Sequence, residues 1–328
     1  MKALPCRSEH GLTLVELMIA IVIGLFLVSG LVFLFIASKG SYSETERLAR
    51  IGENGRFAWR VLERDLRRAG FMGGVAAAAV ESDPDLGTVA GDCLAPAGAY
   101  DLAGNQVAVT RADSSGKAWG CVTDAVPGTD VVVIKAVRPY PLSDGARDDP
   151  SDDDGSIDSP QPISAGNVYV LANPMTGRLF RGDDGTPPLT GPSGEVPAGS
   201  AWEYRYMVYY IRAGSIPSLS RKVLVRESGV MKLTTEDMVE GIEQLRILAG
   251  DDNDGDGVVD RYRDSTAVTD WSRVTALQVS LLVRSLDREP NYQDGRAYVL
   301  GNESFTPGGS FQRTVIQGSV ALRNRQRV

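Results

Sequence analysis

The sequence predicts an α+β protein in which one long N-terminal helix packs on an antiparallel-dominated β head domain. Two observations carry this prediction. Residues 17–38 are uncharged and consist mostly of Leu, Ile, Val and Phe, whereas short runs rich in Val, Ile and Tyr follow residue 71 and are separated by turn residues. A stripe of apolar and small residues between 48 and 69 extends the apolar segment into one long helix, and the strands can pack on this stripe.

The first half of the predicted helix is long enough to cross a bilayer. About 20 consecutive apolar residues span the hydrocarbon core, and residues 17–38 meet that requirement. Glu16 stands directly before this segment. A carboxylate within lipid costs about 3 kcal/mol on insertion scales and usually marks a functional residue. One alternative is a glutamate that reaches the membrane interface and needs no partner.

The second half of the helix is predicted to be amphipathic. Its apolar and small residues recur every three or four positions: Leu48, Ile51, Gly55, Ala58, Leu62, Leu66 and Ala69. Gly70 and the pair Gly73 and Gly74 predict its end. At about 1.5 Å per residue the whole helix would be about 80 Å long. Gly52 and Gly55 predict a bend or local melting.

The rest of the chain is predicted to form short strands and loops. Val, Ile and Tyr are enriched in strands, and Gly, Pro, Asp and Asn in the turns between them. Predicted loops cover 144–161 and 182–199, which are rich in Gly, Pro and acidic residues. The predicted strands are 106–110, 129–137, 167–172, 202–212, 221–227, 241–248, 273–285 and 311–322.

Charge and histidine content exclude several classes of function. The chain has 34 Lys and Arg against 42 Asp and Glu, a balance that opposes nucleic-acid binding. His10 is the only histidine. If the chain is cleaved after Gly11, Ser–His or Cys–His catalysis and zinc ligation by histidine are impossible. We therefore expect no enzymatic activity.

The N-terminus carries a specific pattern. A short polar leader with Lys2 and Arg7 ends at Gly11, and Leu-Thr-Leu-Val-Glu and the apolar run follow. This pattern resembles the class III signal of type IV prepilins and type II secretion pseudopilins. The resemblance implies cleavage after Gly11 by the prepilin peptidase and methylation of the new N-terminus at Leu12, where the family more often has Phe. Glu16, then the fifth residue, would pair with the N-terminal amine of a neighbouring subunit.

Features further along the chain resemble the PilW-type minor pilins. They are the helix end 64–71, the strand 274–284 that follows Trp271, and the C-terminal strand ending at 320–324. The resemblance implies a leader at 1–11, a pilin helix at 12–70 and an extracytoplasmic head at 71–328. The protein would be held in the inner membrane with its head in the periplasm, and could enter the surface pilus.

The resemblance also implies partners and leaves alternatives open. Expected partners are the prepilin peptidase, other minor pilins, the major pilin and an adhesin at the pilus tip, in a complex that primes or caps the filament. One alternative is a type II secretion pseudopilin of the J type. Another is a membrane-anchored periplasmic calcium-binding or adhesive module that never polymerises.

The cysteines predict one disulfide. Cys6 lies in the leader, so Cys93 and Cys121 remain in the mature chain. Outside the cytoplasm such a pair persists as a disulfide, worth roughly 3–4 kcal/mol in the chain-entropy model. Two free buried thiols are the alternative.

An acidic stretch predicts a calcium loop. Asp252, Asp254, Asp256 and the following Gly match D-x-D-x-D-G, the opening of an EF-hand-type loop. Val258 would contribute its carbonyl oxygen, and Asp260 a direct or water-mediated ligand. Position twelve departs from the pattern, because Arg263 replaces the bidentate Glu, although Asp264 could substitute. A solvated acidic turn explains the same residues, and both interpretations stay open.

Overall fold

The computed structural model describes residues 11, 13–94, 98–104, 106–142, 163–183, 193–290 and 292–324. The leader before Gly11, Leu12, the predicted loop 144–161 and residues 184–192 of the second predicted loop lie outside these ranges. By their internal contacts, residues 1–50 form one compact unit and residues 51–328 a second one.

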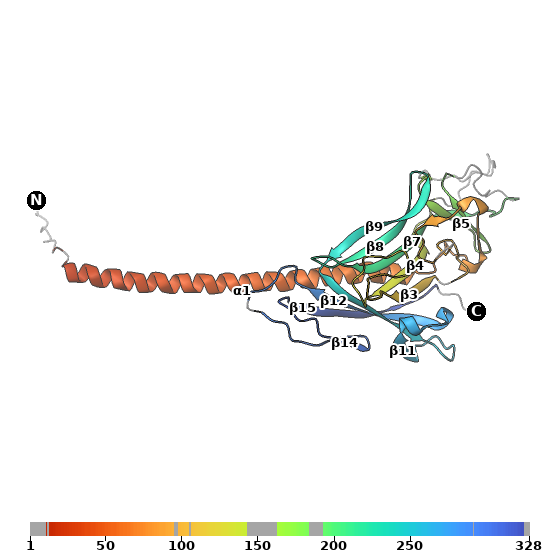
Figure 1. The fold of residues 1–328 in the computed structure, drawn as a ribbon. Helices are drawn as coiled ribbons and strands as arrows, with labels where there is room; N and C mark the ends of the chain where they lie inside the picture. Colours follow the sequence, from red (N-terminus) through yellow and green to blue (C-terminus); the bar gives the residue numbers. More distant parts are fainter. Residues whose placement is uncertain are drawn as a thin grey trace, which may run out of the picture. The chain divides into compact units, whose positions relative to one another are not determined.

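Helix α1 (Leu14–Arg68) runs from the N-terminal unit into the second unit without interruption (Figure 1). It is long and apolar enough to cross a membrane by length and composition. The predicted local melting at Gly52 and Gly55 does not occur, because both residues are helical. Gly55 is buried instead: a Cβ atom there would lie 2.8 Å from Cγ1 of Ile316. The glycine therefore permits close packing of the helix against β15.

The larger sheet has nine strands and is mostly antiparallel. Its main path runs β1-β6-β5-β7-β8-β9-β2, with β4 pairing to both β3 and β7. Only the β1–β6 and β2–β9 pairs within the described residues are parallel. The strands are β1 (Val80–Ser82), β2 (Val89–Ala90), β3 (Val107–Arg111), β4 (Asp130–Val137), β5 (Val168–Ala172), β6 (Gly177–Arg181), β7 (Ser200–Arg212), β8 (Ser218–Glu227) and β9 (Val230–Glu240).

A second sheet has four antiparallel strands in the order β11-β10-β12-β15. Its strands are β10 (Ile242–Asp251), β11 (Arg261–Asp264), β12 (Val274–Arg284) and β15 (Arg313–Ala321), and a separate hairpin pairs β13 (Tyr298–Leu300) with β14 (Glu303–Phe305). Short 3-10 helices connect some strands: η1 (Ala77–Ala79), η2 (Pro84–Leu86), η4 (Ser265–Ala267) and η5 (Trp271–Arg273).

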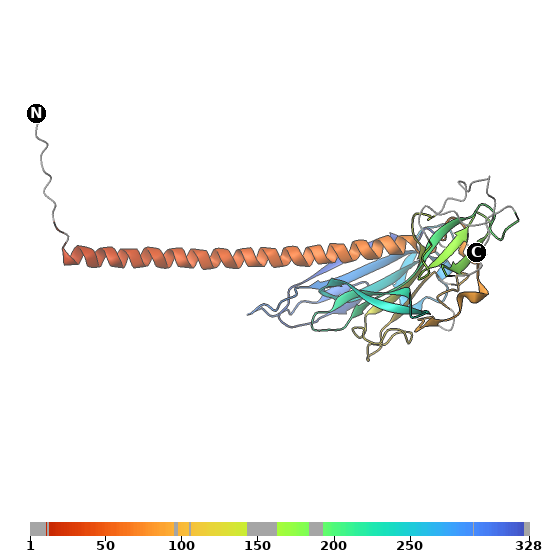
Figure 2. The same ribbon diagram turned by 90° about the horizontal axis from the view of Figure 1, so that it is seen from above.

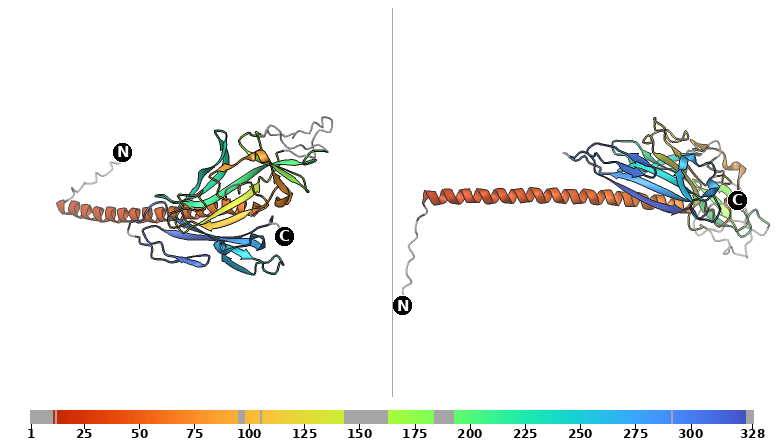
Figure 3. Two further views of the ribbon diagram at one scale, coloured as in Figure 1. Left: turned by 45° about the vertical axis from the view of Figure 1, so that its right-hand side comes forward. Right: turned by 90° about the horizontal axis from the view of Figure 1, so that it is seen from below.

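The main core lies between the two sheets and includes the last turns of α1. Figures 1, 2 and 3 show those turns running beside the strands of the head. Buried side chains from the helix meet buried side chains of both sheets, including Tyr209 and Ile247. A second core covers the opposite face of the large sheet and includes Tyr206 and Val208. The alternation along β7 thus divides its residues between two cores.

One polar group on the helix is buried with this apolar stripe. Asp65 accepts a hydrogen bond of 2.5 Å from the Tyr209 hydroxyl and forms an ion pair of 3.0 Å with Nε of Arg64. Arg221 approaches the same carboxylate at 3.7 Å. A buried carboxylate without partners would cost several kcal/mol, so these contacts allow Asp65 to fix the helix against β7 and β8.

The prediction of the fold class is confirmed, and every predicted strand corresponds to an observed one within a few residues. Several observed strands were not predicted: β1, β2, β6, β9, β11, β13 and β14. The longest of these is β9, whose exposed positions include Thr234, Glu236, Asp237 and Glu240. Its sequence lacks the Val, Ile and Tyr enrichment on which the prediction relied.

Gly318 on β15 provides a test of the packing between α1 and the four-stranded sheet. A Cβ atom at this position would lie 2.3 Å from Cζ2 of Trp59 on the helix. We expect Gly318→Ala to lower the free energy of unfolding by about 1–3 kcal/mol, as overpacking does. Denaturant unfolding of the purified protein measures the change.

The neighbouring residue gives a matched control for this prediction. Ser319 is exposed on the same strand, and Ser319→Ala should change the free energy of unfolding by no more than about 0.5 kcal/mol. Trp59→Leu should recover part of the loss when combined with Gly318→Ala, because the two sites are in contact. Equal stability of Gly318→Ala and Ser319→Ala would contradict the proposed close packing.

Candidate functional site

The residues predicted to direct processing and assembly lie at the start of α1. Thr13 precedes the helix, and its backbone N–H and its hydroxyl each donate to Oε2 of Glu16 at 2.9 Å. The N–H of Glu16 lies 3.3 Å from the Thr13 hydroxyl and donates to it. This reciprocal arrangement is a capping box, in which a Thr and a Glu three residues later satisfy helix N-terminal donors.

This local role of Glu16 was not predicted from the sequence. The pattern Thr-x-x-Glu directly before an apolar run is itself the signature of a capping box. In the described structure Glu16 therefore has a partner within its own chain, and its side chain is exposed. Pairing with the amine of a neighbouring subunit remains a prediction. Leu12 lies outside the described residues, and Gly11 is exposed.

The apolar segment that follows has no cover within the described structure. Its large side chains, including Phe26, Phe33 and Phe35, are all exposed. An exposed apolar surface on every side of a helix marks a segment that lipid or other helices cover. The membrane-spanning character predicted for 17–38 agrees with this exposure.

The predicted disulfide is present in the head. Cys93 and Cys121 are joined, with their Cα atoms 4.8 Å apart. Cys93 is buried beside Asp92, whose carboxylate accepts hydrogen bonds from the Tyr206 hydroxyl at 3.0 Å and the backbone N–H of Ala99 at 2.8 Å. The bridge thus ties an irregular segment to the second core next to β7.

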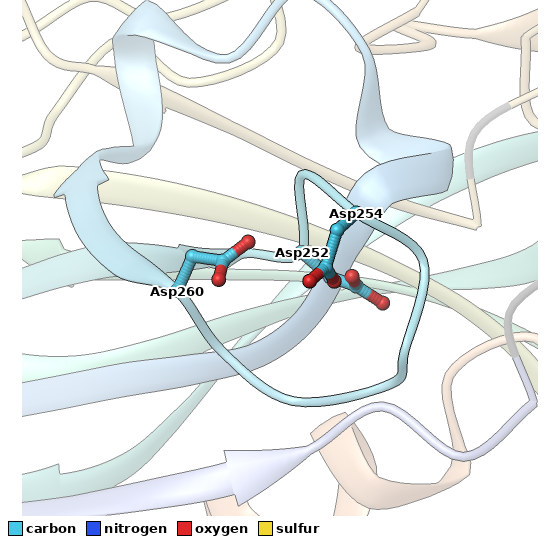
Figure 4. Close-up of side chains that lie close together, drawn as sticks. All are labelled: Asp252, Asp254 and Asp260. Atoms are coloured by element: carbon cyan, nitrogen blue, oxygen red, sulfur yellow. The ribbon is translucent and has the colours of Figure 1, made fainter.

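The acidic stretch forms the loop between β10 and β11. Within it, carboxylate oxygens of Asp252, Asp254 and Asp260 all lie within 4.8 Å of one another (Figure 4). Asp252 is buried and the other two are exposed. Three carboxylates at this separation repel one another in the absence of a cation. Carboxylate oxygens are the ligands that a hard cation such as calcium prefers.

The loop also has internal hydrogen bonds of the kind that stabilise an acidic turn without a cation. Asp252 accepts from the N–H groups of Gly255 and Gly257, and Asp260 accepts from that of Asn253. Asp256 does not join the converging group among the described residues; its carboxylate accepts from the N–H of Val258 at 2.7 Å. The structure thus brings together three of the four predicted aspartates.

The missing twelfth ligand is not replaced by its neighbours. Arg263 on β11 forms an ion pair of 3.2 Å with Asp251. Asp264 pairs with Arg111 at 2.7 Å and accepts hydrogen bonds from Thr266. Burial opposes the ionisation of Asp264, but these contacts hold its pKa below the ordinary value. Both side chains serve strand and turn contacts instead of the loop.

Comparison with known families gives two matches. Residues 6–32 match the prokaryotic N-terminal methylation motif, and residues 208–324 match the type IV pilus-assembly protein W family. No curated protein and no solved structure matches the chain. The second match extends from the middle of β7 to the end of the described residues, and so includes all strands of the four-stranded sheet.

These matches confirm the resemblance to a PilW-type pilin with a prepilin signal. They connect the chain with type IV pilus assembly and with the pilus machinery. The match to a pilus-assembly family favours a structural role. The apolar helix and the prepilin motif indicate membrane anchoring of a soluble head.

Calcium binding at the acidic loop is a testable prediction. We expect calcium, titrated calorimetrically into the full-length protein in non-ionic detergent, to bind with a Kd in the range of about 10⁻⁵–10⁻³ M, because one of the usual ligands is absent. Bound calcium should also raise the melting temperature.

A double variant with a matched control isolates the loop. Asp254→Asn with Asp260→Asn should abolish the calorimetric heat, since it removes two of the three converging carboxylates. Asp270→Asn is the control, because Asp270 is an acid of the same region that caps η5 and lies outside the group. No heat and no thermal shift at millimolar calcium would leave the solvated acidic turn as the correct interpretation.

Proposed function

We propose that this protein is a minor pilin of a type IV pilus, cleaved after Gly11 and assembled with other pilins into a complex that primes or caps the filament. The observation that carries the proposal is the order of features at the N-terminus. A polar leader, Gly11, Glu16 at mature position five and a membrane-length apolar helix follow one another, and the region matches the methylation motif.

The physical argument concerns where the apolar half of α1 can reside. Its exposed side chains need lipid before assembly and neighbouring helices after it. A helix that enters the membrane with a cleaved, charged N-terminus must place that amine beside a counter-charge. Glu16 of a neighbouring subunit supplies one, so the same carboxylate that caps α1 in the isolated chain would pair between subunits in the filament.

The proposed location follows from the same segment. Before assembly, residues 17–38 would hold the protein in the inner membrane, with the head in the periplasm. The disulfide Cys93–Cys121 is consistent with a head outside the cytoplasm, where such bonds persist. Partners would be the prepilin peptidase, the other minor pilins, the major pilin and a tip adhesin. A J-type secretion pseudopilin is the second candidate, and the match of 208–324 to a pilus-assembly family favours the pilus.

Cleavage at Gly11 tests the class of protein. In cells that express the prepilin peptidase, wild-type protein should appear as a shortened band, with Leu12 as its first residue by mass spectrometry. Gly11→Val should leave only the longer, uncleaved protein, because a side chain at the cleavage position blocks the peptidase. Ala37 lies outside the leader, so Ala37→Val serves as the control and should be cleaved normally. Normal cleavage of Gly11→Val would overturn the assignment.

The charge of Glu16 tests the assembly role separately from the capping role. Glu16→Gln keeps an oxygen that can accept the hydrogen bonds from Thr13, since Gln also completes a capping box, but it removes the charge. We therefore expect at least a tenfold smaller amount of the variant protein in sheared pili, measured by immunoblot. Glu16→Ala should lose both roles and be no better incorporated.

A third variant distinguishes the two explanations. Thr13→Val removes the hydroxyl of the capping box and keeps the charge of Glu16, so its incorporation should exceed that of Glu16→Gln. Cleavage of each variant is checked first by its apparent mass. Wild-type incorporation of Glu16→Gln would show that assembly does not need the charge of Glu16 and that Glu16 acts only as a helix cap. Absence of the wild-type protein itself from sheared pili would favour a membrane-anchored module that does not polymerise.

A further inference from the structure

An arginine-rich cleft lies where the last turns of α1 meet the large sheet. It has a volume of about 390 Å³, and all its lining residues belong to the unit formed by residues 51–328. No feature of the proposed function uses it. Its basic residues come from the helix, from the residue that follows β4, from β7 and from β8: Arg64, Arg68, Arg138, Arg205 and Arg221.

The fold brings these separated positions to one place. Arg64 and Arg68 are four residues apart and lie on the same face of α1. Arg205 pairs in register with Ala136 of β4, two residues before Arg138 in the chain. On the other side of β7, Arg221 of β8 pairs with Tyr209. Strand alternation places residues 205, 207 and 209 on the face that packs towards α1.

The carboxylates beside the cleft do not balance its five guanidinium groups. Asp65 contacts Arg64 and Arg221, and Glu203 contacts Arg138 and Arg205 at 2.7 and 2.9 Å. The third acid, Glu236, contacts Arg221 at 2.8 Å.

Arg68 differs from the other four arginines of the cleft in its ion pairing. Within the described part of the chain, its guanidinium forms no ion pair. Five arginines against three acids leave an excess of two positive charges in a protein whose net charge is −8. Burial is the main cause of the lowered pKa of Arg205; Glu203 and, more weakly, Glu236 oppose the shift, and repulsion by Arg138 and Arg221 adds to it.

The chemistry of the lining narrows the class of ligand. All its basic residues are arginines, whose planar guanidinium groups bind carboxylates through two parallel hydrogen bonds. Met207 and Val223 form a buried apolar part of the lining, and Tyr140 is 79% exposed. Arginine and exposed tyrosine beside an apolar floor are the residues enriched where proteins bind other proteins.

We propose that this cleft binds an acidic peptide segment of a partner protein, with at least two neighbouring carboxylates and an apolar side chain. Arg68 and Arg64 on α1 would hold one carboxylate, and Arg138 with Arg205 would hold the next. The apolar side chain would contact Met207 and Val223. This inference goes beyond the proposed function, because binding of the peptide requires neither cleavage nor a filament.

A nucleic acid fits the cleft less well. Nucleic-acid binding needs a basic stripe that follows many phosphates, whereas this positive charge is confined to a cleft of about 390 Å³ in an acidic protein. A single peptide side chain and its neighbours match a cavity of this size, which is near the lower limit for ligand sites.

Peptide binding to the full-length protein in non-ionic detergent tests the proposal. The probe is a fluorescein-labelled peptide that alternates Leu with Glu and Asp, and its counterpart has Gln and Asn in place of the acids. Fluorescence anisotropy should show saturable binding of the acidic peptide and at least tenfold weaker binding of the amide peptide. The affinity should fall as salt is raised, because the contacts are between charges.

A matched pair of charge reversals locates the binding. Arg68→Glu should weaken binding of the acidic peptide at least tenfold. Arg60→Glu makes the same change in net charge at an exposed position of α1 outside the cleft, and it should stay within twofold of wild type. Thermal unfolding of both variants verifies that the head is intact, and Arg138→Gln provides a second cleft variant if Arg68→Glu unfolds.

Several results would overturn the proposal. They are absence of saturable binding, equal binding of the amide peptide, equal weakening by Arg68→Glu and Arg60→Glu, and binding of inorganic phosphate or a single-stranded oligonucleotide without binding of the acidic peptide. None of these results affects the cleavage test at Gly11. Failure of that test, in turn, would leave peptide binding by the cleft intact.

Discussion

The burial of the second half of α1 is the constraint on which the head depends. Ile51, Ala58, Leu62 and Leu66 are almost completely buried, and they contact strands of both sheets in one core. Complete burial of a large apolar side chain contributes about 1.5–3 kcal/mol relative to exposure. Without the helix, the inner faces of the two sheets would lose a shared apolar partner. The close approach of Trp59 to Gly318 shows how little free space the packing leaves.

One polar interaction accompanies this burial and connects it to the arginine-rich cleft. Asp65 is buried on the helix face that meets β7, where Tyr209 and two arginines satisfy its carboxylate. Burial, and then the nearby charge of Asp65, raises the pKa of the Tyr209 hydroxyl, which therefore remains a neutral donor to the carboxylate. Arg64 and Arg221 share Asp65, and Arg221 also pairs with Glu236, so the single carboxylate of Asp65 does not balance both guanidinium groups. The contact that positions the helix thus also leaves positive charge in the cleft beside it.

The sequence was sufficient to predict the elements whose patterns are local. The helix, its apolar first half and its amphipathic second half follow from residue spacing, and strands such as β4 and β12 follow from runs of Val, Ile and Leu. The capping box at Thr13 and Glu16 was also accessible, since it lies within four consecutive residues. The arginine-rich cleft was not accessible: its residues lie between positions 64 and 223, and only strand register brings them together. The convergence of Asp260 with Asp252, but not of Asp256, likewise depends on the path of the loop.

The two halves of α1 place opposite demands on their surroundings. Beyond Ile51 the helix has one apolar stripe, and the head covers it. In the first half the apolar side chains point in all directions and are exposed, so the contacts of the described chain leave them without cover. Such a surface is unstable in water and stable in lipid or against other apolar helices. The first half must therefore obtain its cover from outside the chain, whereas the head obtains its core from within. Exchange of lipid for neighbouring helices would consequently leave the packing of the head unchanged, as the proposed move of this protein from a membrane into a filament requires.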